Sequence, residues 1–150
     1  MAALTNVEGV GYTKYSDGGV GNLVSYRWGN NVYATTDTYT VPTGDTVAVS
    51  TSLYMGRVPK GARILGFFFS QSGAGGAATG GVKIGSTAAT STTGLTDMTS
   101  ATAQFLPCNE AVAKSPITSD SDVTILLTDA ADLDAATTVT LTTLYTVEPS

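Results

Sequence analysis

The sequence has no histidine and only one cysteine, Cys108. Serine and cysteine hydrolases use histidine as their usual general base, so Cys108 has no imidazole to activate it as a nucleophile. A single cysteine also allows no disulfide within the chain. We therefore interpret Cys108 as an inert, buried thiol. We expect the protein not to be an enzyme and to need no cofactor.

Charged residues are also scarce, at 13% of the 150 residues, and most of them are acidic. Seven Lys and Arg against twelve Asp and Glu give a net charge of −5 and a pI near 4.3. Nucleic acids and anionic membrane surfaces both attract proteins with clustered basic residues. The seven basic residues are scattered, so we expect neither nucleic acid nor membrane as a partner.

Long apolar stretches are missing as well. No run approaches the roughly 20 apolar residues that cross a bilayer as a helix. The first residues, MAALTNVEGV, contain no basic region and no long apolar run of the kind found in signal peptides. We expect a protein that is made in a cytoplasm and does not enter a membrane.

Threonine and glycine are what the sequence has in quantity, with 26 Thr and 17 Gly. Exposed helices usually carry many charged residues, whereas β-branched threonine suits the wet face of a strand. Apolar residues alternate with Thr and Ser in Thr46–Met55, Asp122–Thr128 and Thr138–Val147, the pattern of half-buried strands. Ala62–Gln71 is apolar on both faces, so we expect it to be central or covered by a partner.

Further short strands are predicted at Leu23–Tyr26, Val32–Thr35, Gly81–Gly85 and Ala101–Leu106, with single helical turns at 109–114 and 129–136. Seven or eight short strands joined by turn-rich loops predict an all-β fold, an antiparallel, jelly-roll-like β-sandwich. Residues 46–150 are expected to form this body.

Residues 1–45 differ from the rest, because five of the seven Tyr and the only Trp lie there among glycines. We interpret them as an extended N-terminal arm with short strands. The alternative is an ordinary glycine-rich start to the fold, with its aromatic residues packed on the body.

Two groups of residues have the composition of ligand sites. Gly73–Ala78 fits the loose G-x-G-x-x-A spelling of a dinucleotide loop, but no helix that would hold the phosphate is predicted after it. Carboxylates gather late in the chain, at Asp120, Asp122, Asp129, Asp132 and Asp134. They lack the glycine and glutamate spacing of an EF-hand calcium loop. We interpret both groups as loops and expect no metal and no small-molecule substrate.

Three of the seven basic residues, Arg57, Lys60 and Arg63, flank the turn predicted at 58–61. Pro59 and Gly61 favour a turn at this point. The basic residues are either the solvated flank of a turn or a cationic contact for an acidic protein partner.

The segment Arg57–Leu65, RVPKGARIL, resembles the "lPkGA-hydrophobic" turn and strand of small virion proteins from tailed bacteriophages. That family continues with a Ser/Gly-rich loop and a short strand ending in Gly, matched here by 70–81 and 82–85. Its "T-x-D-x-D-I/V" approach to a late strand is matched by Thr118–Val123, and its closing Thr/Val strand by Thr137–Val147. The resemblance covers about residues 46–148 and does not include the N-terminal segment.

These virion proteins are similar to capsid decoration, or cement, proteins. The resemblance implies a homotrimer on the outer capsid surface of the virion that binds neighbouring subunits of the major capsid protein. With it, we predict a subunit interface at Leu65, Phe67 and Phe69. The predicted capsid contacts are Tyr12, Tyr15, Trp28, Arg57, Lys60 and Arg63. The alternative is a carbohydrate-binding or host-adhesion β-sandwich module of a phage fibre, in which Trp28 and the Tyr cluster stack on sugar rings.

Overall fold

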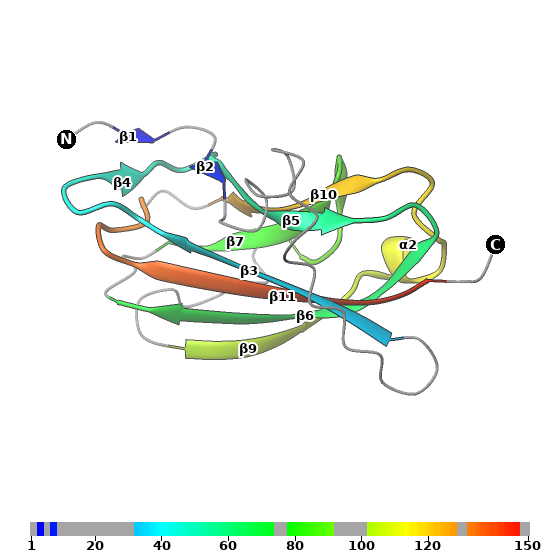
Figure 1. The fold of residues 1–150 in the computed structure, drawn as a ribbon. Coiled ribbons are helices and arrows are strands. Elements are labelled where there is room, and N and C mark those ends of the chain that lie inside the picture. Colours follow the sequence, from blue (N-terminus) through cyan, green and yellow to red (C-terminus); the bar gives the residue numbers. More distant parts are fainter. Residues whose placement is uncertain are drawn as a thin grey trace.

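The computed structural model describes residues 3–4, 7–8, 32–73, 78–91, 102–128 and 132–147. These residues form a β-sandwich of two main sheets, which confirms the predicted all-β fold (Figure 1). The elements are β1 (Ala3–Leu4), β2 (Val7–Glu8), β3 (Val32–Thr40), β4 (Thr46–Val47), β5 (Ser52–Val58), β6 (Ala62–Ser72), β7 (Gly80–Ile84), β8 (Thr87–Ala88), β9 (Thr102–Pro107), α2 (Glu110–Ala113), β10 (Ser121–Leu127) and β11 (Thr138–Val147).

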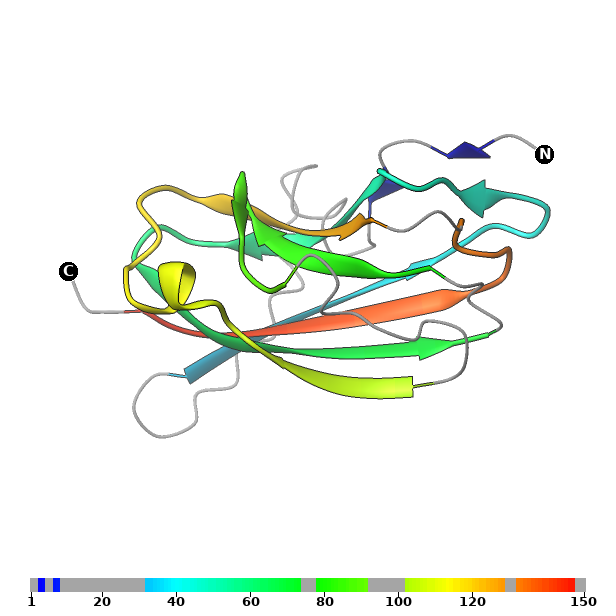
Figure 2. The ribbon, with the colours of Figure 1, turned by 180° about the vertical axis from the view of Figure 1, so that it is seen from behind.

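The longer strands alternate between the sheets along the chain. Strands β5, β7 and β10 lie in the five-stranded sheet β2-β5-β10-β7-β8, and β6, β9 and β11 lie in the four-stranded sheet β3-β11-β6-β9. Figure 2 shows the two layers from behind, with α2 at one end of the sandwich. Pairing within both sheets is antiparallel except between β2 and β5. Repeated crossing between two antiparallel sheets gives the predicted jelly-roll-like path.

The core lies between the inner faces of the two sheets. Strand β11 shows how the sequence produces it, because Val139, Leu141 and Tyr145 are buried while the threonines at alternate positions are half-buried. This two-residue period matches the pleat of a strand that is wet on one face. The largest fully buried side chains are Phe67, Phe69, Leu53, Met55, Ile64, Ile125, Leu127, Leu133, Leu141 and Val41.

Strand β6 lies between β11 and β9, the central position expected for this segment. Its pairing with β11 shifts by one residue, because Leu144 is opposite Gly66 and Tyr145 is opposite Ile64. Leu65 is therefore the extra residue of a β-bulge. The bulge reverses the alternation along the strand, so Ile64 points inward before it and Phe67 points inward after it.

The predicted boundary at residue 45 is corrected by the structure. Strand β3 pairs with β11 along its whole length, from Val32 opposite Thr146 to Thr40 opposite Thr138. The sandwich therefore includes Val32–Thr40, which extends the predicted strand at 32–35. Strands β1 and β2 also pair, in parallel, with β4 and β5. The strand predicted at 23–26 lies outside the described residues.

Two further predictions need adjustment. The strand predicted at 46–55 is interrupted between β4 and β5, where Ser50 has a positive φ of 68° and its N–H donates to the carbonyl of Leu127. The helical turn predicted at 109–114 is confirmed as α2, but residues 132–136 contain no helix. Within the described ranges, no helix is long and apolar enough to cross a membrane.

Candidate docking surface

The outer face of the four-stranded sheet carries a ladder of threonine pairs between β3 and β11. Cross-strand hydroxyl pairs of this kind stabilise antiparallel sheets. The Oγ1–Oγ1 distances are 2.8 Å for Thr36 and Thr142, 3.0 Å for Thr38 and Thr140, and 2.9 Å for Thr40 and Thr138. These hydroxyls form hydrogen bonds with one another. A partner that docks on this half of the face would therefore meet threonine methyl groups and hydroxyls that already have a hydrogen-bond partner.

The other half of the face, on β6 and β9, carries an aromatic patch, which we define as Leu65, Phe68 and Phe105. Their side chains are exposed by 47%, 51% and 53%. Phe68 and Phe105 are opposite each other in the β6–β9 pairing, with ring centroids 5.0 Å apart. Val49 is the remaining exposed large apolar side chain in residues 32–73, 78–91, 103–128 and 132–147. Exposed apolar surface is thus concentrated on one sheet, as at sites of protein association.

A shallow groove of about 300 Å³ lies against this patch. It connects the aromatic half of the face with the threonine half. Its lining residues are Phe68, Phe69, Ser70, Ala103, Gln104, Phe105, Thr140 and Thr142. The face therefore combines projecting rings with an adjacent hollow.

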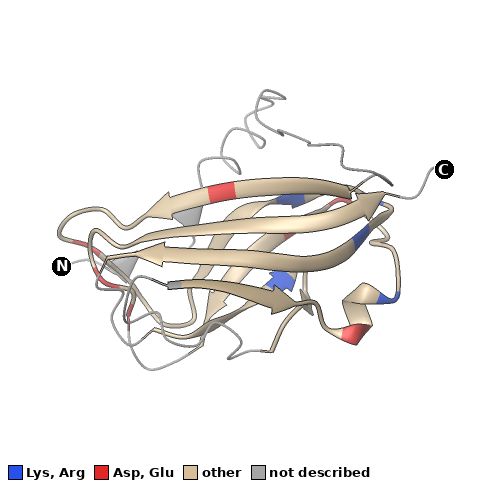
Figure 3. Ribbon diagram, turned by 90° about the horizontal axis from the view of Figure 1, so that it is seen from below, with Lys and Arg blue, Asp and Glu red and all other residues tan. Residues whose placement is uncertain are grey.

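The four strands of this sheet contain only two charged residues, Asp37 and Arg63. Figure 3 shows the sheet from below, with its strands mostly uncharged. Asp37 is 3% exposed, so its carboxylate is not on the surface. The Arg63 guanidinium lies at the start of β6 and donates from Nη1 to the carbonyl of Lys114 at 2.8 Å. The outer face between them is neutral, although the chain has a net charge of −5.

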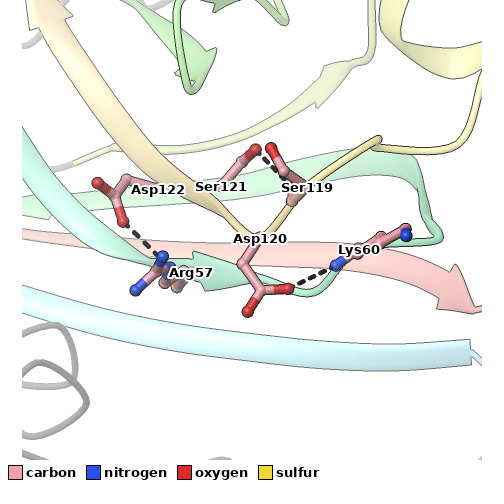
Figure 4. Close-up of polar contacts among 6 residues, drawn as sticks. All are labelled: Arg57, Lys60, Ser119, Asp120, Ser121 and Asp122. Atoms are coloured by element: carbon pink, nitrogen blue, oxygen red, sulfur yellow. Dashed lines mark hydrogen bonds and ion pairs between the residues drawn. The ribbon is translucent and has the colours of Figure 1, made fainter.

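The predicted basic turn between β5 and β6 is held by two carboxylates from the start of β10 (Figure 4). Asp120 Oδ1 accepts a hydrogen bond from the backbone N–H of Lys60 at 2.9 Å. Asp122 Oδ1 lies 3.5 Å from Arg57 Nε. These contacts give the two aspartates a structural role and reduce the positive charge that the turn presents.

Asp132, another member of the late carboxylate group, makes its contacts elsewhere. Asp132 accepts hydrogen bonds at the β4 end of the sandwich, from Thr46 Oγ1 at 3.1 Å and from the backbone N–H of Val49 at 3.3 Å. Asp129 lies outside the described residues. In the part of the chain that the structure describes, no group of three or more Asp, Glu, Cys or His is placed to hold a metal ion.

Gly73–Ala78 connects β6 to β7, and residues 74–77 lie outside the described part of the chain. A strand and not a helix follows, so the connection lacks the helix N-terminus that a dinucleotide loop requires. Cys108 is partly buried, and burial raises the pKa of its thiol to about 11. The thiol is therefore protonated at neutral pH, in agreement with its interpretation as unreactive.

The predicted subunit interface is corrected for two of its three residues. Phe67 and Phe69 are 0% and 1% exposed in the core of this single chain, so their rings have no surface to offer a second subunit. Leu65 is exposed as the interface prediction requires. Sequence reasoning missed Phe68, because the bulge at Leu65 determines which phenylalanines of β6 face outward. It missed Phe105, because that residue joins the patch only through the pairing of β9 with β6.

Among the predicted capsid contacts, Tyr12, Tyr15 and Trp28 lie outside the described residues. Two other members of the Tyr cluster, Tyr33 and Tyr39, are partly buried against the core. Tyr33 stacks on Tyr145, with ring centroids 5.6 Å apart. These two tyrosines serve packing and do not form an exposed platform.

Comparison with known proteins gives structural matches only. No protein-family model matches the sequence, and a search of curated proteins found no match. The fold is similar to a chain from the capsid of Ralstonia phage GP4, with 13% identity, a TM-score of 0.66, and coverage of 99% of this chain and 100% of that chain. It is also similar to a chain from the capsid asymmetric unit of Cyanophage Pam1, with 15% identity, a TM-score of 0.51, and coverage of 86% and 95%. At these identities the likeness shows a shared fold.

Proposed function

We propose that this chain is a virion structural protein that decorates the outer surface of a tailed-phage capsid. In this role it binds neighbouring subunits of the major capsid protein as a homotrimer and stabilises the shell. The observation that carries the proposal is the fold likeness to a chain of a phage capsid over essentially the full length of both polypeptides. The likeness thus extends over nearly all of both compared chains.

Three features of the described residues support this role. The four-stranded sheet presents a neutral outer face with an aromatic patch, a surface suited to association. Three of the five late carboxylates that resembled a ligand site, Asp120, Asp122 and Asp132, are instead engaged in hydrogen bonds or an ion pair. The RVPKGARIL segment, which resembles the turn and strand of small virion proteins, forms the connection between β5 and β6.

The stabilising mechanism follows from mass action. A protein that binds the assembled shell but not its dissociated subunits lowers the free energy of the shell by RT ln(1 + [L]/Kd), about 2.7 kcal/mol per site at one hundred times the Kd. No catalytic step is needed. A rigid β-sandwich suits this task, because little conformational entropy is lost when a preformed surface docks.

The test is to add the purified chain to shells that lack it and to measure binding by co-sedimentation and heat resistance by release of the packaged DNA. We expect saturable binding and a higher release temperature. If the protein does not bind shells and its absence leaves them equally heat-resistant, the proposed function is wrong.

The predicted cationic contact is tested by the variant Lys60→Glu. Lys60 contacts Asp120 through its backbone N–H, so a new side chain leaves that hydrogen bond in place. Lys83→Glu is the matched control, because Lys83 lies on β7 and not in the turn between β5 and β6. Weaker shell binding by Lys60→Glu alone would support the contact, whereas equal binding by both variants would exclude Lys60 from it.

The alternative function is a carbohydrate-binding or host-adhesion module of a phage fibre, in which Trp28 and the Tyr cluster stack on sugar rings. Tyr33 and Tyr39 pack against the core and do not favour it. A glycan array probed with the purified chain separates the two functions, since specific sugar binding is expected only of the adhesion module.

A further inference from the structure

We propose that the outer face of the four-stranded sheet is the surface through which copies of this chain bind one another, with Phe68 and Phe105 at the centre of the contact. The inference rests on the homotrimer of the proposed function and identifies the surface that forms it. The occupant of the groove beside these rings is then a second copy of the same chain.

Charge is the first argument for a second copy. Each chain has a net charge of −5, so two copies repel each other through most orientations. Asp37 and Arg63 are the only charged residues in the strands of this sheet. The Asp37 carboxylate is buried, and the Arg63 guanidinium donates to the Lys114 carbonyl. This is a face on which like-charged copies meet without bringing carboxylates together.

Composition is the second argument. Interfaces between copies of one chain are more apolar than transient contacts, and their cores are depleted of charge and enriched in aromatic residues. The aromatic patch has this composition, with Leu65, Phe68 and Phe105 about half exposed.

Shape is the third argument. The face carries projecting rings and, directly beside them, a groove of about 300 Å³ that Thr140 and Thr142 line on the β11 side. A contact between identical chains requires that one chain supply both the projection and the hollow. Phe68 or Phe105 of one copy seated in the groove of the next meets this requirement.

The position of the patch on the sheet also favours a second copy. It lies on β6 and β9, and β9 is an edge strand of the sheet. The patch is therefore off-centre, toward one side of the face. Three off-centre patches converge on a common axis when three copies are arranged in a ring, which fits the homotrimer better than full face-to-face stacking of two copies.

The test is the oligomeric state of the purified full chain, measured by sedimentation velocity at micromolar concentrations without shells. We expect a trimer for the unmodified chain. Thr140→Lys places a charge beside the groove and leaves both phenylalanines in place, so we expect it to shift the protein to monomers. Thr87→Lys is the matched control on the exposed β8 of the other sheet and is expected to stay trimeric.

The variant Phe68→Thr/Phe105→Thr removes the rings themselves and is expected to weaken self-association at least tenfold. Circular dichroism and thermal unfolding of each variant confirm that it remains folded. A monomeric unmodified chain, or a Thr140→Lys variant as trimeric as Thr87→Lys, would overturn the inference.

Failure of this inference is distinguishable from failure of the proposed function. A chain that forms trimers through this face but does not bind shells supports the inference and contradicts the decoration role. A chain that is monomeric yet binds shells, and loses that binding in Thr140→Lys, supports decoration and shows that the face docks on the shell.

Discussion

The ring of Phe105 lies over Gly66 on the outer face of the four-stranded sheet. A Cβ added at Gly66 would lie 2.7 Å from Cζ and 2.9 Å from Cε2 of that ring, closer than carbon atoms approach in proteins. The absence of a side chain at residue 66 therefore makes room for the ring. An aromatic side chain that covers a cross-strand glycine in this way stabilises a sheet.

We predict that Gly66→Ala destabilises the protein by about 1–3 kcal/mol, because the new methyl group overpacks against the ring and against the Leu106 carbonyl oxygen, 3.0 Å away. Urea unfolding measures the change, and Ser70→Ala, at an exposed position of the same strand, is the control. Combining Gly66→Ala with Phe105→Ala removes part of the clash, so the double variant should lose less stability than the sum of the two single variants. Strict additivity would contradict the coupling.

The threonine ladder gives a second prediction. Thr140→Val keeps the shape of the side chain but removes the hydroxyl that pairs with Thr38 at 3.0 Å. We expect a loss of about 0.2–1 kcal/mol in the free energy of unfolding, the range for one cross-strand pair. The double variant Thr38→Val/Thr140→Val replaces the hydroxyl pair by a valine pair and should recover most of the loss. If Thr140→Val is as stable as the unmodified chain in urea, the hydroxyl pair contributes nothing.

A third prediction concerns the turn between β5 and β6. Asp120→Ala removes the acceptor of the Lys60 N–H, and we expect a loss of about 1 kcal/mol, the usual net value of one hydrogen bond. Asp120→Asn retains an acceptor oxygen and should lose less. Ser119→Ala is the matched control, since Ser119 accepts from Ser121 Oγ through its backbone carbonyl and not its side chain. Equal stability of the alanine variants at 119 and 120 in urea would contradict a role for this carboxylate.

Much of the fold was predictable because it depends on a local period. The alternation in Thr138–Val147 appears directly as the buried and half-buried positions of β11. The period fails where the backbone departs from regular pleating. Ser50, with its positive φ, divides the strand predicted at 46–55, and the bulge at Leu65 reverses the inward face of β6. Ser50 and Leu65 are neither glycine nor proline, so the residue type at these positions did not predict the break or the bulge.

The candidate surface was less predictable, because its contacts join residues that are distant in the sequence. Asp120 and Lys60 are sixty positions apart, and only the pairing of β10 with β5 brings them together. The aromatic patch similarly requires β9 beside β6. The sequence predicted that the strand at 62–71 carries more apolar surface than one sheet face needs, but the choice between Phe67 and Phe68 depends on the bulge.

The last prediction concerns Cys108, whose pKa burial raises from an ordinary value of 9.0 to about 11. Since the native thiol holds its proton more tightly than the unfolded one, its contribution to stability is complete below pH 9 and is lost between pH 9 and about pH 11. At pH 8 we expect iodoacetamide to alkylate the native chain more slowly than the urea-unfolded chain, because the thiolate is the reacting species. Between pH 8 and pH 11 the urea midpoint of the unmodified chain should fall further than that of Cys108→Ala, which has no thiol to titrate. Equal alkylation rates for native and unfolded protein at pH 8 would show that the thiol is neither buried nor shifted.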